Sequence, residues 1–471
     1  MKKNSIIGNA FYLFLGNVLV RFLTAASTIL IARYLGAEDY GVLSIALAYA
    51  SVAAYFTDLG LTHTLIREGT KEHSSIPILM SSFFRVRIIL SLVTILFSIL
   101  IIEFLYHDDY LKEVLYIVLI PTIMGAALQG VGAVYYQLIE KMHITAIIRT
   151  IAGLTTAIAL IAGMIFKWPL LFIAPVYGLA NVLAGLFSIF IVIKYVNIFK
   201  GWNKSILDGL FSFTISGLTI MLLPQIGPIV IEKASGLKEA GFFSAAYRIP
   251  SLLYQIPGVV AAAFYPVLFR LGNNQEFDKH LELNTRQLKI MSFLGISMAI
   301  PFLFFSKWWI HFLFGAKWEQ SATPLSILAL MVVLQSFNYP MADSLTTKGK
   351  QKTRTIIQLF ALILGIVLYY TLSSKLGSTG GALAAVLIEG ILFTCFSLFQ
   401  KNSLRLLWNG GAKVLASFFI VCLLYWLTRS FIHPLIGSIG LDIIFIVFIL
   451  LIDSEIKKFL FDKVISKLVK K

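Results

Sequence analysis

The sequence is poor in charged residues and has few cysteines. Only 13% of its 471 residues are charged, whereas a soluble domain carries about 25%. A chain with so little charge cannot cover a folded surface in water. The two cysteines, Cys395 and Cys422, offer neither a disulfide framework nor metal-ligand spacing, so we expect them to pack as small apolar side chains.

The sequence also lacks the short motifs of ATP-driven pumps and zinc peptidases. Neither G-x-x-x-x-G-K-[ST] nor H-E-x-x-H occurs, which excludes those two chemistries from this chain. The expected external loops are short, whereas membrane glycosyltransferases usually carry an acidic motif on a long external loop. We therefore predict that the protein is not an enzyme and needs no metal or cofactor.

Long apolar runs dominate the sequence instead. Hydrophobic residues make up 58% of the chain and gather in runs of about 20, the length that crosses a hydrocarbon core of about 30 Å. We predict an all-α integral membrane protein with about fourteen transmembrane helices. The expected spans are 8–32, 41–62, 87–106, 114–138, 144–166, 170–196, 206–231, 241–269, 288–312, 324–346, 355–374, 380–400, 411–432 and 435–452.

Basic residues are distributed unevenly between the expected loops. With the N-terminus in the cytoplasm, the cytoplasmic segments hold 28 of the 39 lysines and arginines, and the external loops hold 9. This is the positive-inside pattern, so we expect both ends in the cytoplasm of a multi-pass protein of the cell (inner) membrane. The same pattern explains the formal net charge of +16 without a nucleic-acid partner. The apolar run after Lys2 and Lys3 reaches Ala32, which is too long for a cleaved signal peptide.

Two parts of the chain repeat each other at an offset of about 200 residues. Residues 36–41 and 236–241 both read G-x-x-x-x-G, and Leu128-Gln129 recurs as Leu334-Gln335. Six spans per unit indicate two six-helix lobes as a parallel repeat, a common transporter plan. The predicted parts are an N-lobe at 1–200, a C-lobe at 201–402, two C-terminal spans at 403–452 and a cytoplasmic amphipathic basic tail at 453–471.

Two arginines fall inside expected spans and are the only basic residues that cannot be assigned to a loop or to the end of a span. Arg21 lies near the middle of the first span, and Arg248 lies early in the eighth. Ionisable groups at membrane depth usually face a cavity or a partner. Two guanidiniums in one cavity make a site for phosphate or pyrophosphate through bidentate bonds. Structural pairing with acids such as Asp58 or Glu389 is the alternative.

Asp58 and Glu389 themselves lie within or near spans. Each is a candidate for proton or sodium coupling, or a counter-ion for a neighbouring cation. Asn17 and other amides within the spans would line a hydrated path or bond neighbouring helices.

Three segments near the start resemble a known family. They are Ile31 to Gly41 (IARYLGAEDYG), Thr57 to Leu61 (TDLGL) and Ile66 to Glu68 (IRE), and they are similar to the start of Wzx-type oligosaccharide flippases. That polysaccharide-transporter branch belongs to the multidrug/oligosaccharidyl-lipid/polysaccharide (MOP) exporter superfamily. The resemblance implies two lobes around a cationic cavity, alternating access, and a substrate of sugars linked to a polyprenyl pyrophosphate.

The resemblance also suggests which residues bind the substrate. Related lipid II flippases use arginines of the first and eighth spans, and Arg21 and Arg248 match these by span position. Asp39 resembles an acidic residue of their first outer loop. Their second-span arginine has no counterpart between Gly41 and Thr62, which favours a surface-polysaccharide repeat unit over lipid II. The expected substrate-binding residues are Arg21, Arg248, Asn17 and Asp39.

Two other functions remain as alternatives. A cation-coupled multidrug exporter of the same superfamily would place carboxylates in its cavity, which the arginines disfavour. A membrane glycosyltransferase or polysaccharide polymerase is disfavoured by the short external loops. For a flippase in O-antigen, capsule or exopolysaccharide synthesis, the expected partners are the lipid-linked glycan, membrane lipids and the polysaccharide polymerase machinery.

Overall fold

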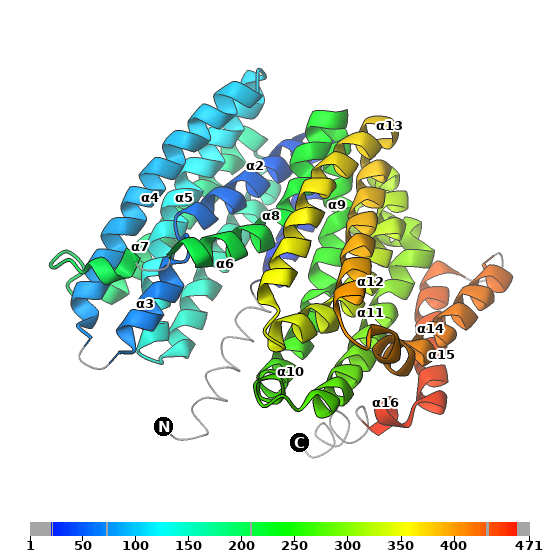
Figure 1. Ribbon diagram of the computed structural model, residues 1–471. Coiled ribbons are helices and arrows are strands. Elements are labelled where there is room, and N and C mark those ends of the chain that lie inside the picture. Colours follow the sequence, from blue (N-terminus) through cyan, green and yellow to red (C-terminus); the bar gives the residue numbers. More distant parts are fainter. Residues whose placement is uncertain (1–19, 21, 72–73, 208–209, 430–432, 459–471) are drawn as a thin grey trace, which may run out of the picture. The chain divides into compact units, whose positions relative to one another are not determined.

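The computed structural model describes residues 20, 22–71, 74–207, 210–429 and 433–458. Within these ranges the chain is helical and has no strand (Figure 1). Ten helices in these ranges are long and apolar enough to cross a membrane, or eleven if one bent pair counts as a single span. The predicted all-helical membrane fold is therefore confirmed. The number fourteen, the two six-helix lobes and the cytoplasmic ends remain predictions.

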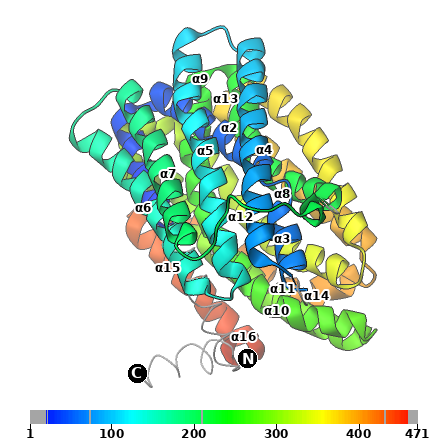
Figure 2. The ribbon, with the colours of Figure 1, turned by 90° about the vertical axis from the view of Figure 1, so that its left-hand side faces the viewer.

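The chain forms two compact units, Met1–Gly241 and Phe242–Lys471. In the first unit, α4, α5 and α7 run side by side as long helices (Figures 1 and 2). Its described helices are the apolar helix Phe22–Leu35, α2 (Ala37–Phe56), α3 (Leu61–Gly69), α4 (Ile76–Leu105), α5 (Asp109–Leu138), α6 (Met142–Ile165), α7 (Leu170–Ile193), the short η1 (Lys204–Leu207) and α8 (Leu210–Ser235).

The second unit is built around α11, α12 and α13, and α14 and α15 pack against α11. Helix α9 begins in the first unit and continues into the second. The described helices are α9 (Leu237–Leu253), α10 (Gln255–Asn273), α11 (Phe277–Phe314), η2 (Ala316–Ser321), α12 (Ala322–Thr347), α13 (Gln351–Phe399), α14 (Ser403–Thr428), α15 (Pro434–Ile452) and α16 (Ser454–Lys458).

The outward surfaces of these helices are apolar, as lipid contact requires. In the most apolar stretch of α4 only 17% of the residues are buried. Phe104 is 84% exposed, and Leu96 and Phe97 are each 59% exposed. A helix in water would instead present polar residues on this face. The exposed apolar bands therefore agree with a membrane environment.

Several spans are broken at positions that only glycine tolerates easily. The expected span 41–62 corresponds to α2 and α3, which meet at a turn where Gly60 has φ +85°. The expected spans 355–374 and 380–400 are the two halves of α13, which breaks at Gly377 with φ +56° and ψ −136°. A side chain would be strained in these conformations. The single expected span 41–62 is thus a two-part helix in the fold, whereas the break at Gly377 lies between two spans that the sequence already expected to be separate.

The two G-x-x-x-x-G segments adopt the same local structure. Gly36 and Gly236 have φ +81° and +91°, and each precedes the first residue of a helix, α2 or α9. Where these two helices begin, they also lie against each other. A Cβ on Gly41 would lie 2.1 Å from the Leu237 carbonyl oxygen, and one on Gly241 would lie 1.9 Å from that of Ala37. The contact is therefore symmetric, and both glycines are needed for it.

Candidate functional site

The predicted substrate residues are only partly described by the structure. Arg21 and Asn17 lie outside the described residues. Arg248 is half-buried on α9, two residues before Pro250, and its carbonyl oxygen accepts a 2.7 Å hydrogen bond from the Ser251 hydroxyl. A substrate site that contains both arginines therefore remains a prediction.

Asp39 lies in the first turn of α2 and is partly exposed. Its Oδ1 accepts a hydrogen bond of 3.0 Å from the hydroxyl of Tyr110, which is itself exposed at the start of α5. This hydrogen bond connects the N-terminal ends of α2 and α5 and orients the carboxylate. Its role toward a substrate remains a prediction.

A buried ion pair lies beside the break between α2 and α3. Nη1 of Arg87 lies 2.7 Å from Oδ1 of Asp58, and the same oxygen accepts a 2.6 Å bond from the Thr62 hydroxyl. Nη2 of Arg87 donates to the carbonyl oxygen of Ala126 at 3.2 Å. Only 6% of Arg87 is exposed. Asp58 is therefore a counter-ion, as one of the two interpretations of the sequence expected.

The expectation that Arg21 and Arg248 are the only basic residues away from loops and span ends is wrong. The sequence placed the start of this span at residue 87, but α4 begins at Ile76, so Arg87 lies three turns inside the helix. Gly130 provides the space for the guanidinium, because a Cβ there would lie 2.2 Å from Nη1 of Arg87. The sequence feature that could have indicated this position is Gly130 on α5, because a glycine there leaves room for a large side chain from the neighbouring helix.

Glu389 is the second buried carboxylate that the sequence singled out. It lies in the second half of α13 and is 7% exposed. Its Oε1 accepts a 2.8 Å bond from Nε2 of Gln335, and its Oε2 accepts a 2.7 Å bond from Nδ2 of Asn338. Both amides come from α12. The sequence predicted that amides within the spans line a hydrated path or bond neighbouring helices, but it could not assign any of them to Glu389.

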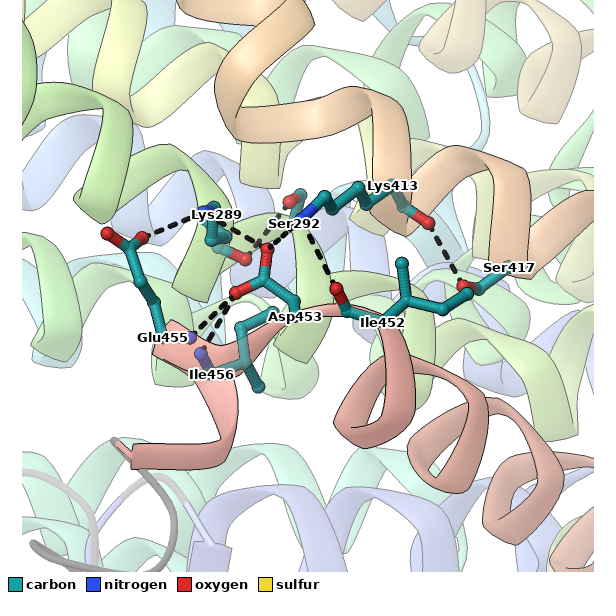
Figure 3. A network of polar contacts seen from close by, with 8 residues as sticks. All are labelled: Lys289, Ser292, Lys413, Ser417, Ile452, Asp453, Glu455 and Ile456. Carbon is teal, nitrogen blue, oxygen red and sulfur yellow. Dashed lines mark hydrogen bonds and ion pairs between the residues drawn. The ribbon is translucent and has the colours of Figure 1, made fainter.

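A third polar cluster joins α11, α14 and the C-terminal end of α15 (Figure 3). Nζ of Lys289 lies 3.1 Å from Asp453 and 2.7 Å from Glu455, and Lys413 donates to the Ile452 carbonyl oxygen at 3.2 Å. Burial alone would raise the pKa of Asp453, but bonds from Lys289 and from the backbone N–H groups of α16 lower it. The ionised cluster attaches the C-terminal segment to the second unit.

The part of the chain that the structure describes contains no group of three or more His, Cys, Asp or Glu side chains arranged to hold a metal ion. The buried carboxylates described above are held instead by an ion pair at Asp58 and by amide hydrogen bonds at Glu389.

A family model and several curated proteins match the chain. The family described as polysaccharide biosynthesis protein matches residues 6–272. A protein of Shigella flexneri described as an O-antigen transporter is 22% identical over 417 residues, which cover 82% of this chain and 96% of that protein. Lipopolysaccharide biosynthesis protein WzxC of Escherichia coli (strain K12) is 20% identical over 409 residues, covering 83% and 80%. The succinoglycan biosynthesis transport protein ExoT of Rhizobium meliloti (strain 1021) is 26% identical and covers 64% of this chain and 61% of that protein.

Two solved structures show the same fold. The lipid II flippase MurJ in an inward closed conformation has a TM-score of 0.70 at 18% identity, covering 93% of this chain and 98% of MurJ. An inward-facing multidrug resistance transporter of the MATE family, from the MOP superfamily, has a TM-score of 0.68 at 14% identity, covering 82% and 95%. At these identities the likeness establishes the fold, which a flippase and a drug exporter share.

Proposed function

Because the chain belongs to the polysaccharide biosynthesis protein family, we propose that it is a Wzx-type flippase of the cytoplasmic (inner) membrane. It moves oligosaccharide units linked to a polyprenyl pyrophosphate between the two leaflets by alternating access. The observation that carries this proposal is the sequence likeness to proteins named for O-antigen, succinoglycan and lipopolysaccharide transport or biosynthesis, which extends over as much as 83% of the chain.

The physical requirements for moving a lipid-linked sugar across a membrane support the same function. A polyprenyl tail can remain in the hydrocarbon while its head crosses, but a charged, hydroxyl-rich head needs a polar, basic passage. The sequence has no nucleotide-binding motif, so the energy comes from an ion gradient, the membrane potential or consumption of the product.

Within this proposal, Arg21 and Arg248 bind the pyrophosphate, and Asn17 and Asp39 contact the head group. Arginine suits the task because its planar fork forms two parallel bonds to a phosphate and keeps its charge at membrane depth. The part of the site around Arg21 and Asn17 lies outside the described residues.

The test substitutes each arginine and measures export together with protein abundance in the membrane. Arg21→Ala and Arg248→Ala should each abolish export at normal abundance. The lysine variants should restore it only partly, because an ammonium cannot form the bidentate pair. Arg85→Ala, an exposed arginine of α4, is the control and should export normally.

The readout is the amount of lipid-linked sugar on each face of the membrane after deletion of the gene and complementation with each variant. Accumulation on the cytoplasmic face supports the flippase. Normal export by both alanine variants at normal abundance would exclude the arginines as the phosphate site.

The main rival is a multidrug exporter, because the MATE fold is shared. It predicts that the deletion strain becomes sensitive to cationic drugs and keeps normal surface polysaccharide. A glycosyltransferase or polymerase predicts loss of sugar assembly instead of loss of transfer between leaflets. Coupling to the polysaccharide polymerase machinery is a further part of the proposal, and co-purification with that machinery tests it.

A further inference from the structure

Glu389 is a buried carboxylate with no cationic partner among the described residues. Within that part of the chain, no nitrogen of lysine, arginine or histidine lies within 4.0 Å of its oxygens. By contrast, Asp58 has Arg87 at 2.7 Å, and Asp343 has Arg354 at 3.9 Å. Desolvation of an unpaired carboxylate is costly, so a residue of this kind at membrane depth marks a functional site.

The repeated glutamine shows that the packing alone does not require an acid here. In the first unit, Nε2 of Gln129 on α5 donates to the Asn181 carbonyl oxygen on α7 at 3.1 Å. In the second unit, the matching Gln335 on α12 donates to the Glu389 carboxylate on α13 at 2.8 Å. The same interhelical bond thus has a neutral acceptor in one unit and a titratable acceptor in the other.

The surroundings of Glu389 can satisfy both of its protonation states. The ionised carboxylate accepts N–H bonds from Gln335 and Asn338. The neutral acid carries one O–H donor and then needs an acceptor. The buried Oε1 of Gln335 and Oδ1 of Asn338 have no hydrogen-bond partner in the part of the chain that the structure describes. Rotation of either amide by half a turn brings such an oxygen to the acid.

We propose that Glu389 is a proton-binding site, loaded on one side of the membrane and emptied on the other during the transport cycle. On loading, the carboxylate and one proton form a neutral carboxylic acid, and on emptying the same O–H bond breaks. The coupling part of this inference rests on the proposed transport function, but the binding part does not.

Among the described residues, the other titratable groups that interact with Glu389 are tyrosines. They are Tyr247 from α9, Tyr339 from α12 and Tyr369 from the first half of α13. Phenols are neutral at physiological pH. Among these four described side chains, Glu389 is therefore the one that can exchange a proton without forming a phenolate.

The binding part is tested with dicyclohexylcarbodiimide, which reacts with protonated carboxyl groups in apolar surroundings. We expect the full-length protein in proteoliposomes to be labelled at Glu389, with labelling that falls as the pH rises. Glu389→Gln should remove that label. Labelling that does not depend on pH, or protection by sodium at constant pH, would overturn the assignment of a proton.

The two glutamines provide a matched pair of variants. Gln335→Leu removes a bond to the charged form, so the pH of half-maximal labelling should rise by about one to two units. Gln129→Leu removes the equivalent bond to a neutral carbonyl and should leave that pH unchanged. An equal shift in both variants would mean that the effect is structural and would contradict the site.

The coupling part is tested by export under an imposed pH gradient. Wild-type export should accelerate several-fold, and Glu389→Gln should lose that response at normal abundance. A full response in Glu389→Gln overturns coupling through this residue. If the wild type moves no lipid-linked sugar while Glu389 still titrates, the proposed function fails and the proton site stands.

Discussion

At the scale of single residues, the burial of Arg87 is explained by its partners. The guanidinium has an acid, a backbone carbonyl and a hydroxyl around it, and a glycine on the neighbouring helix leaves room for it. Nε of Arg87 nevertheless has no hydrogen-bond partner within the described ranges. A charge in this position depends strongly on Asp58, because no other acid lies within ion-pairing distance among the described residues.

Removal of Asp58 should therefore destabilise the protein. Asp58→Asn leaves a buried, uncompensated charge, and we expect a loss of about 3–5 kcal/mol of unfolding free energy. The double variant Arg87→Met with Asp58→Asn should recover a large part of that loss. Thermal unfolding of purified protein, together with its abundance in the membrane, measures both effects.

The control for this prediction is Arg85→Met, two residues away on the same helix but exposed. Its effect should stay within about 1 kcal/mol. A single Asp58→Asn variant as stable as the wild type would show that the ion pair contributes nothing to the fold.

At the scale of the helices, glycine decides how closely α2 and α9 approach. Each of Gly41 and Gly241 lies against a carbonyl oxygen of the other helix at a distance that no Cβ could occupy. The two helices begin with the same turn, so the contact places equivalent residues opposite each other. The sequence showed the repeated glycines, and the fold shows that they meet.

Gly41→Ala and Gly241→Ala should each push the two helix ends apart. Because the obstacle is rigid backbone, we expect a loss of about 1–3 kcal/mol for each variant. Gly440→Ala in α15 is the control, since nothing lies within 4 Å of a Cβ there. Thermal unfolding of the purified variants gives the comparison, and equal melting temperatures for all three would contradict the close contact.

At the scale of the whole molecule, the positive-inside pattern predicts the orientation of every loop. Reporter fusions at Lys112 and Lys375 should be external, and fusions at Lys200 and Lys401 should be cytoplasmic. In the structure, Lys112 lies near the start of α5 and Lys200 follows the end of α7. Lys375 lies near the end of the first half of α13, and Lys401 follows the end of its second half. One reversed reporter would contradict fourteen spans with both ends inside.

The sequence alone determined the fold class and much of the span positions. Crossing a hydrocarbon layer requires about 20 apolar residues in a row, and a run of that length is visible without knowledge of its neighbours. Seven of the expected spans match single helices within a few residues at the C-terminal end, such as 114–138 and α5. The first residues of the expected spans were less accurate, because α4 and α11 begin well before the apolar run does.

Only the tertiary structure decided which polar groups meet. Arg87 and Asp58 are 29 positions apart, Gln335 and Glu389 are 54 apart, and Lys289 and Glu455 are 166 apart. Hydropathy adds up contributions along one helix, whereas pairing depends on how each helix is rotated and which helix packs against it. That is why the sequence named Asp58 and Glu389 with the same two alternatives, whereas among the described residues Asp58 pairs with a cation and Glu389 bonds to two amides.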